Sequence, residues 1–157
     1  KAVLKIVEEK LYTPVGLRSL PMEDVHYVHN YEGDAWHRDS SYHQGTVWSW
    51  LLGAYVDAIM RPHLNPPLRG GLEEAAAKKK NKKVIDDFKY HLSEGCIGSV
   101  SEIFDADAPH HPRGCIAQAW GVAEWLRVMK DYSLFDSAKK SGTGKTKKTA
   151  AENISAT

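Results

Sequence analysis

The chain is poor in cysteine and has no long apolar run. It holds 2 cysteines in 157 residues, Cys96 and Cys115, too few for the disulfide framework of a small secreted protein. No apolar stretch approaches the roughly 18 residues that cross a bilayer, and the first ten residues are amphipathic rather than signal-like. We therefore expect a cytoplasmic protein with reduced thiols and no membrane partner.

An excess of charge of either sign is also missing. The sequence has 21 Lys+Arg and 20 Asp+Glu, and the part before residue 137 is mildly acidic. A nucleic-acid surface needs a basic stripe, whereas the lysine run at 78–83 is typical of a solvated helix face. The Lys-, Ser- and Thr-rich end cannot bury enough apolar surface to become ordered. We expect no nucleic-acid partner, one domain over residues 1–135 and a disordered tail over residues 136–157.

Apolar side chains at helical spacing predict four helices, over residues 2–11, 46–60, 72–93 and 115–132. The second is apolar on nearly every side, as in a helix buried among others. Residues 17–44 lack a sustained period but are rich in aromatic side chains, which predicts an ordered loop. Residues 62–71 are a Pro- and Gly-rich break. Since no convincing strand pattern appears, the expected fold class is all-α.

Two loop segments, each followed by an apolar helix, carry most of the polar chemistry. Residues 99–120 hold Glu102, Asp105 and Asp107 within six positions and end on Gln118 and Trp120. Residues 42–50 have the same layout. Loops on a rigid scaffold commonly carry function. Carboxylates beside aromatic and amide side chains favour a carbohydrate-processing site, although Trp120 also fits the core face of the last helix.

Several side chains of the earlier segment are candidates for holding a sugar. His43 and Gln44 can hydrogen-bond sugar hydroxyls, and Trp48 or Trp36 can offer a ring face, with core packing as the alternative for Trp48. Trp50 is expected in the core. Two further candidates, Arg38 and Asp39, either form an ion pair that holds the loop or clamp sugar hydroxyls.

The later segment has structural as well as functional interpretations. Asp105 and Asp107 are typical turn or capping residues, and Asp105 is also a candidate sugar ligand that Arg113 can pair with in a bidentate manner. A zinc scaffold is an alternative of low weight, because its four candidate ligands match no familiar spacing: Cys96, His110, His111 and Cys115. We expect no metal and no cofactor.

Three segments carry a resemblance to a known family, at residues 11–20, 38–53 and 99–124. Over roughly residues 1–130 the chain resembles the C-terminal glucosidase region of prokaryotic-type glycogen debranching enzymes. The resemblance implies part of an (α/α)6 barrel of helical hairpins. It also implies amylo-α-1,6-glucosidase activity on the branch-point glucose of trimmed glycogen, limit dextrin or another α-glucan. Four helices would be only the last part of such a barrel, so an upstream barrel segment or an oligomer partner is expected.

The resemblance further places Glu102 as the ionised base of an inverting, two-carboxylate hydrolysis. The matching general acid, an aspartate of the family's earlier helices, has no counterpart here. The alternative is a non-catalytic carbohydrate-binding or assembly module derived from that domain. Three positions depart from the family pattern: Ser49 and Ala54 replace prolines, and Ala106 replaces a glycine. If position 106 needs a positive φ, alanine would strain the loop that carries Glu102.

Overall fold

The computed structural model describes residues 2–60 and 72–135. Its α-helices are α1 (Ala2–Ile6), α2 (Ala35–Ser41), α3 (Leu51–Met60), α4 (Leu72–Phe88) and α5 (Ala119–Asp131). A π-helical turn, Val7–Leu11, continues α1, and a 3-10 turn, Lys89–Ser93, continues α4. The strands are β1 (Tyr12–Thr13), β2 (Gly16–Arg18), β3 (Val47–Trp48), β4 (Ile103–Phe104) and β5 (Pro112–Arg113).

The expected all-α fold, a portion of an (α/α)6 barrel, is wrong, because the described residues also form a five-stranded antiparallel sheet. Its strand order is β1-β2-β3-β4-β5, and β3 pairs with β4 so that Val47 lies opposite Phe104 and Trp48 opposite Ile103. Each strand has only two or three residues, too few for a period-two alternation of polar and apolar side chains to appear in the sequence. The sheet brings the segment before α3 next to the loop that carries Glu102.

The helix predictions succeeded where a helix is long and periodic. Helical backbone covers residues 2–11 and 72–93 as expected. The helix expected from residue 46 begins at Leu51, after β3, and the one expected from residue 115 begins at Ala119. The expected loop over residues 17–44 contains the end of β2 and all of α2. The break at 62–71 and the tail at 136–157 lie outside the described residues.

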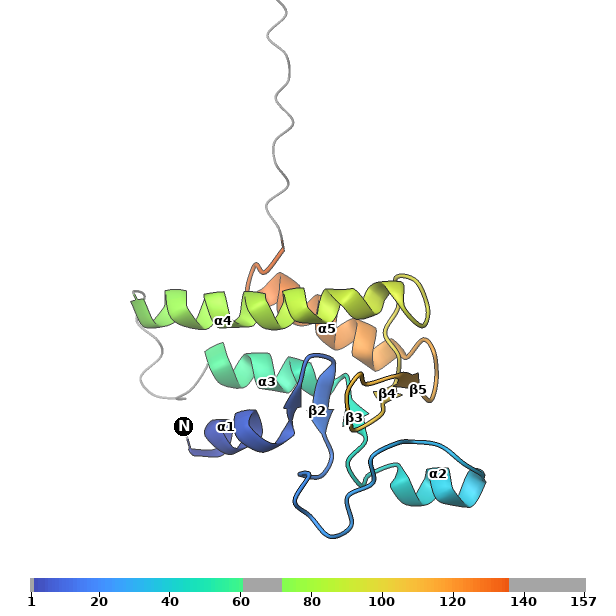
Figure 1. Cartoon of the computed structure of the whole chain (residues 1–157). Helices are drawn as coiled ribbons and strands as arrows, with labels where there is room; N and C mark the ends of the chain where they lie inside the picture. The colour runs from blue at the N-terminus through green and yellow to red at the C-terminus, as the bar shows by residue number, and fades with distance from the viewer. Residues whose placement is uncertain (1, 61–71, 136–157) are drawn as a thin grey trace, which may run out of the picture.

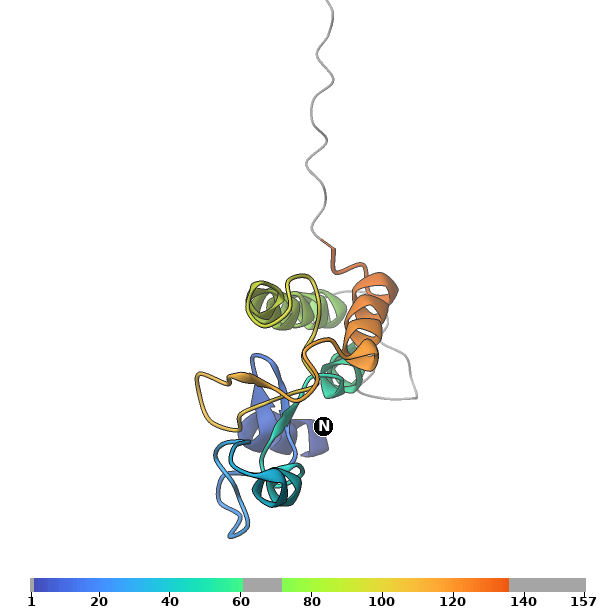
Figure 2. The same cartoon turned by 90° about the vertical axis from the view of Figure 1, so that its right-hand side faces the viewer.

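The core lies between three helices and the sheet. Helix α3 packs against both α4 and α5, and the sheet lies at the other side of α3 (Figures 1 and 2). Fully buried apolar side chains come from all of these elements: Val47, Val56, Ile85, Phe104 and Val128. No helix in the described ranges has the length and apolarity needed to cross a membrane.

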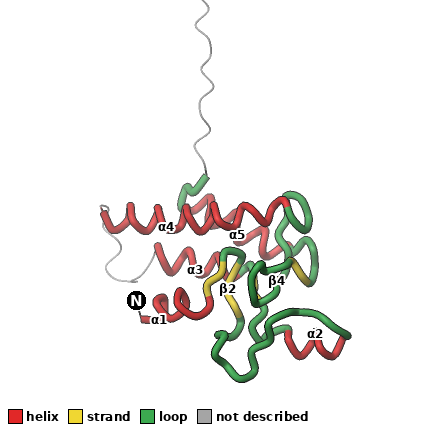
Figure 3. The backbone as a smooth tube through the Cα atoms, in the orientation of Figure 1, coloured by secondary structure: helices red, strands yellow, loops and turns green. Residues whose placement is uncertain are grey.

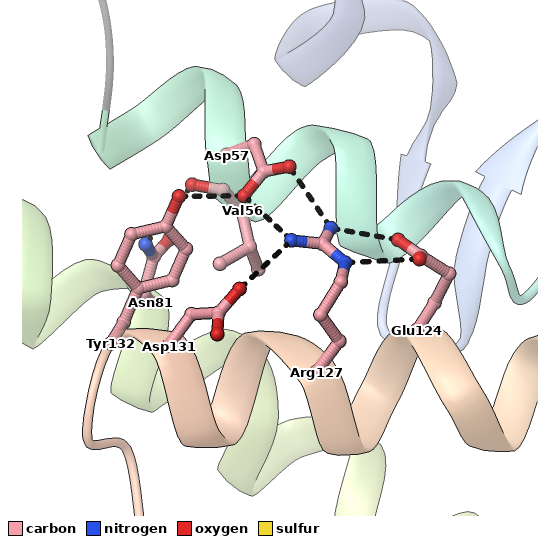
Figure 4. Close-up of polar contacts among 7 residues, drawn as sticks. All are labelled: Val56, Asp57, Asn81, Glu124, Arg127, Asp131 and Tyr132. Atoms are coloured by element: carbon pink, nitrogen blue, oxygen red, sulfur yellow. Dashed lines mark hydrogen bonds and ion pairs between the residues drawn. The ribbon is translucent and has the colours of Figure 1, made fainter.

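Arg127 joins α5 to α3 (Figure 4). Its guanidinium donates to Asp57 at 2.9 Å and to Glu124 at 2.8 Å, and it lies 3.4 Å from Asp131. Tyr132 donates its hydroxyl proton to Asp57 at 2.6 Å. The hydrogen bonds from Arg127 and Tyr132 to Asp57 hold α5 against α3.

The long loops gather at one end of the molecule, beside α2 (Figure 3). Residues 19–34 connect β2 to α2, and residues 105–111 connect β4 to β5. Tyr31 N–H donates to Asp105 at 2.8 Å, and Asp107 N–H donates to the His29 carbonyl at 3.2 Å. The two loops are therefore joined into one wall next to β4.

Candidate functional site

The Glu102 carboxylate is held by a donor at each oxygen. Glu102 immediately precedes β4 and is half-buried. Tyr42 donates its hydroxyl proton to Oε1, and the Cys115 backbone N–H donates to Oε2 at 2.9 Å. A carboxylate oxygen can accept two hydrogen bonds, so each oxygen keeps capacity for a further donor. The carboxylate is thus fixed in direction while each oxygen can still accept a further hydrogen bond.

Gly114 makes this arrangement possible. Its φ is +65°, and a Cβ built on it would lie 2.5 Å from Glu102 Oε2 and 2.9 Å from Ile103 Cγ1. Any other residue would adopt an unfavourable backbone conformation and displace the carboxylate. The glycine therefore allows the chain to pass directly beside the Glu102 carboxylate.

Tyr42 is a residue of the site that the sequence interpretation missed. It follows α2 directly, and burial together with the hydrogen bond to Glu102 raises the pKa of Tyr42 well above its ordinary value. The phenol therefore stays protonated and acts as a donor. Its position between Ser41 and His43, in the segment already selected as polar, was the only sequence signal for it.

An aromatic hollow lies next to Tyr42. Its volume is about 220 Å³, and its lining residues are Ser19, His43, Trp48, Trp50, Leu51 and Trp120. The His43 ring stacks on Trp48 with centroids 5.1 Å apart, and the Tyr42 ring meets both edge-on, at 4.9 Å and 4.8 Å. Tyr42 therefore contacts the Glu102 carboxylate with its hydroxyl and the wall of the hollow with its ring.

The tryptophans are distributed differently from the expectation. Trp48 is buried at the floor of this cluster, but Trp50, expected in the core, is half-exposed. Trp120, which also fitted the core face of its helix, is 46% exposed. Trp50 and Trp120 stack on each other at 5.7 Å and both line the hollow. The core assignment was therefore wrong for Trp50, and of the two interpretations of Trp120 the core one does not hold.

Asp105 anchors the neighbouring loops. Its side chain is 2% exposed and pairs with Arg113 through Nη2 to Oδ2 at 2.9 Å, so the ion pair expected from the sequence is confirmed. Tyr31 N–H also donates a hydrogen bond to Asp105 Oδ1. The hydrogen bond with Asp105 raises the pKa of Arg113. A buried carboxylate requires compensating partners, and Arg113 and the Tyr31 N–H supply them. Asp105 does not line the aromatic hollow, and its role as a sugar ligand stays a prediction.

Asp107 ties the same loops together from the other side. Tyr27 donates its hydroxyl proton to Oδ1 at 2.8 Å, and His29 Nδ1 lies 2.6 Å from Oδ2. Although partial burial opposes it, these two hydrogen bonds lower the pKa of Asp107. Asp107 therefore remains ionised and holds the 19–34 loop against the loop that follows Glu102.

The other candidates lie at the surface around the site. Arg38 donates to the Gly33 carbonyl at 2.7 Å, and in the described part of the chain it forms no ion pair with Asp39. Gln44 contributes its backbone carbonyl, which accepts from Val28 N–H at 2.6 Å. These contacts leave sugar binding by Arg38, Asp39 and Gln44 as predictions.

Gln118 lies at the start of α5, whereas Trp36 lies on α2. Gln118 is the N-cap residue of α5, and its backbone N–H donates to the Val100 carbonyl at 2.8 Å. Its side chain makes no capping hydrogen bond. Trp36 is highly exposed on α2 and does not line the aromatic hollow.

Ala106 fits its loop. It is buried, and it is not among the described residues that have a positive φ. The backbone strain that a positive φ would cause is therefore absent. Its carbonyl accepts from Arg18 Nε at 2.9 Å, which ties the loop to β2. Alanine at this position therefore does not carry the strain of a positive φ.

No group of three or more His, Cys, Asp or Glu side chains in the described residues is placed to hold a metal ion. Both cysteines are free. The lysine run on α4 is largely paired with carboxylates, for example Lys78 with Glu74 at 2.9 Å and Lys82 with Asp86 at 3.1 Å. These pairs are typical of a solvated helix face.

Comparison with known proteins shows which family the chain belongs to. The family model described as amylo-alpha-1,6-glucosidase matches residues 1–127, and the chain belongs to this family. Among curated proteins it is similar to the glycogen debranching enzyme of Saccharomyces cerevisiae (strain ATCC 204508 / S288c). The two are 26% identical over 147 residues, which is 85% of this chain and 9% of the yeast protein. The chain thus spans about a tenth of the length of that relative.

Proposed function

We propose that this chain supplies the catalytic base of a glycoside hydrolase site, which removes α-1,6-linked branch glucose from a glycogen-type α-glucan. One observation carries the proposal: a carboxylate held by two donors lies, through a shared tyrosine, next to a hollow walled by aromatic rings. The family membership and the name of the yeast relative indicate the substrate class. The rings suit the apolar faces of a pyranose, and His43 suits a sugar hydroxyl.

The proposed reaction is an inverting hydrolysis. Glu102 takes a proton from a water molecule as the water oxygen bonds to the anomeric carbon of the branch glucose. The bond from that carbon to the glucan O6 breaks at the same time, and a general acid protonates the departing oxygen. In this proposal the acid comes from outside this chain, and Tyr42 and the Cys115 N–H keep the base pointing at the water.

Two measurements test the proposal. Isothermal titration of the chain with a branched limit dextrin is expected to show saturable binding that Glu102→Gln leaves nearly unchanged. When the chain replaces the segment of the yeast relative that it matches, the resulting fusion is expected to release glucose, first as the β anomer. Glu102→Gln should lower that release by at least about a hundredfold, because proton transfer to a positioned base contributes about 10²–10⁴-fold.

The matched control is Glu23→Gln, which removes an exposed carboxylate that does not line the hollow. It should leave both measurements unchanged. Glucose release by Glu102→Gln at the unmodified rate would remove Glu102 from the mechanism. Binding with no release by the fusion would point instead to a carbohydrate-binding module.

A further inference from the structure

The backbone on both sides of the Glu102 peptide is held by groups from other parts of the fold. Ser101 N–H donates to His91 Nε2 at 3.0 Å, and Glu102 N–H donates to the Cys115 carbonyl at 2.9 Å. The Ser49 hydroxyl donates to the Ser101 carbonyl at 2.8 Å and lies 3.3 Å from the Glu102 carbonyl. Every backbone polar group of Ser101 and Glu102 therefore has a partner in the fold.

Two of these partners act from the core side. Ser49 is 4% exposed and lies between β3 and α3, and His91 is 0% exposed in the 3-10 turn after α4. Ser101 is also 0% exposed. Water cannot replace a hydrogen bond in such a buried position, so loss of either partner leaves a backbone group unsatisfied and favours movement of the turn.

The His91 ring is suited to accept a hydrogen bond from the Ser101 N–H. It packs edge-on against Phe104 at 4.6 Å and against Phe88 at 5.7 Å, and its Nδ1 lies 3.3 Å from Glu94 Oε2. Burial lowers the pKa of His91 although Glu94 opposes the effect. A neutral ring with its proton on Nδ1 leaves Nε2 free to accept, as the contact with Ser101 requires.

We propose that Ser49 and His91 are positioning residues that fix the turn of Glu102 from the core side, while Tyr42 and the Cys115 N–H hold its carboxylate. The catalytic meaning of this proposal depends on the proposed function of Glu102. Ser49 stands where proline is common in the family that the sequence resembles, and proline has no hydroxyl to donate. The hydrogen bond from Ser49 is thus a feature of this chain rather than of that pattern.

The Cys115 amide proton reports the position of the carboxylate, because it donates to Glu102 Oε2. We would measure its hydrogen exchange by NMR in the intact chain and compare it with core amides of α3, which report global stability. Ser49→Ala and His91→Phe should lower the protection of the Cys115 amide at least about tenfold more than that of the α3 amides, the effect of losing one hydrogen bond. His91→Gln, which returns an acceptor, should restore most of it.

The matched control is Thr13→Val. Thr13 is a buried residue of β1 whose hydroxyl donates to the Gly16 carbonyl at 2.9 Å, away from the Glu102 turn. This variant should lower the protection of both sets of amides alike. In the glucose-releasing fusion, Ser49→Ala should lower kcat about tenfold and leave KM within about twofold, because only the base is displaced.

Equal loss of protection at Cys115 and in α3 for Ser49→Ala would overturn the positioning role. If His91→Phe fails to fold, Ser49→Ala and His91→Gln still decide the question. The exchange measurement needs no sugar. A wild-type chain that fails to bind glucan would therefore contradict the proposed function without changing the exchange result.

Discussion

Replacement of Gly114 by alanine tests the geometry at Glu102 most sharply. The added Cβ would lie 2.5 Å from Glu102 Oε2, and because that atom ends a flexible side chain, the carboxylate should move away. The movement removes the hydrogen bond from the Cys115 N–H. Gly114→Ala therefore combines a backbone effect at positive φ with the displacement of one carboxylate.

The two effects have different sizes. An alanine at a φ of +65° loses about 1–2 kcal/mol of stability. A hydrogen bond to a charged group contributes about 1.5–3 kcal/mol. Together they predict that the free energy of unfolding falls by about 2.5–5 kcal/mol in Gly114→Ala.

Gly98→Ala isolates the backbone effect. Gly98 has a φ of +74°, and in the described part of the chain nothing lies within 4 Å of the Cβ position. Urea unfolding at constant m-value should therefore show a loss of only about 1–2 kcal/mol for Gly98→Ala. In a Glu102→Ala background the excess loss of Gly114→Ala should shrink by the part that comes from the carboxylate, and the contact of the added Cβ with Ile103 Cγ1, at 2.9 Å, should account for what remains. Equal losses for the two glycine variants would refute the placement of the carboxylate over Gly114.

Two further predictions concern stability. Arg127→Met should lower the free energy of unfolding by about 1–2 kcal/mol, because it removes charged hydrogen bonds between α5 and α3 that are a third exposed. Thermal unfolding should show this loss. The control Lys83→Met removes an exposed ion pair with Asp87 on one helix and should cost only a few tenths of a kcal/mol. Equal losses for the two variants would contradict the bridging role of Arg127. Stability should also fall as the pH drops below about 6.5, because burial lowers the pKa of His91 and of His110 and the unfolded state binds these protons first. Urea unfolding between pH 7 and pH 5 should show a slope of at most about 1.4 kcal/mol per pH unit for each histidine, and a stability that is independent of pH would contradict it.

The sequence predicted the parts of the fold that repeat with a helical period. Residues 2–11 and 72–93 are helical because their apolar side chains recur at that spacing over several turns. Strands such as Val47–Trp48 and Ile103–Phe104 are too short to produce a pattern, and their pairing joins residues more than fifty positions apart. Trp50 was assigned to the core, and Trp120 was compatible with it, because hydrophobicity alone does not distinguish a buried ring from one that lines a hollow.

The site was predictable in its residue types but not in its hydrogen bonds. Selection of the segments around His43 and Glu102 depended on their polar and aromatic content, and the structure brings both segments to Tyr42. The Cys115 donor is a backbone N–H, which any residue except proline could supply, so no residue type marks it in a sequence. Of the two alternatives for Arg38 and Asp39, the ion pair does not form, because adjacent residues on a helix do not face each other.

An NMR titration of the intact chain with a branched α-glucan oligosaccharide tests the glucan site most directly. The indole signals of Trp48, Trp50 and Trp120 and the amide signal of Cys115 should shift together and saturate at one ligand concentration. Signals that stay unchanged at saturating oligosaccharide, or shifts confined to α4, would contradict a glucan site formed by the hollow and Glu102.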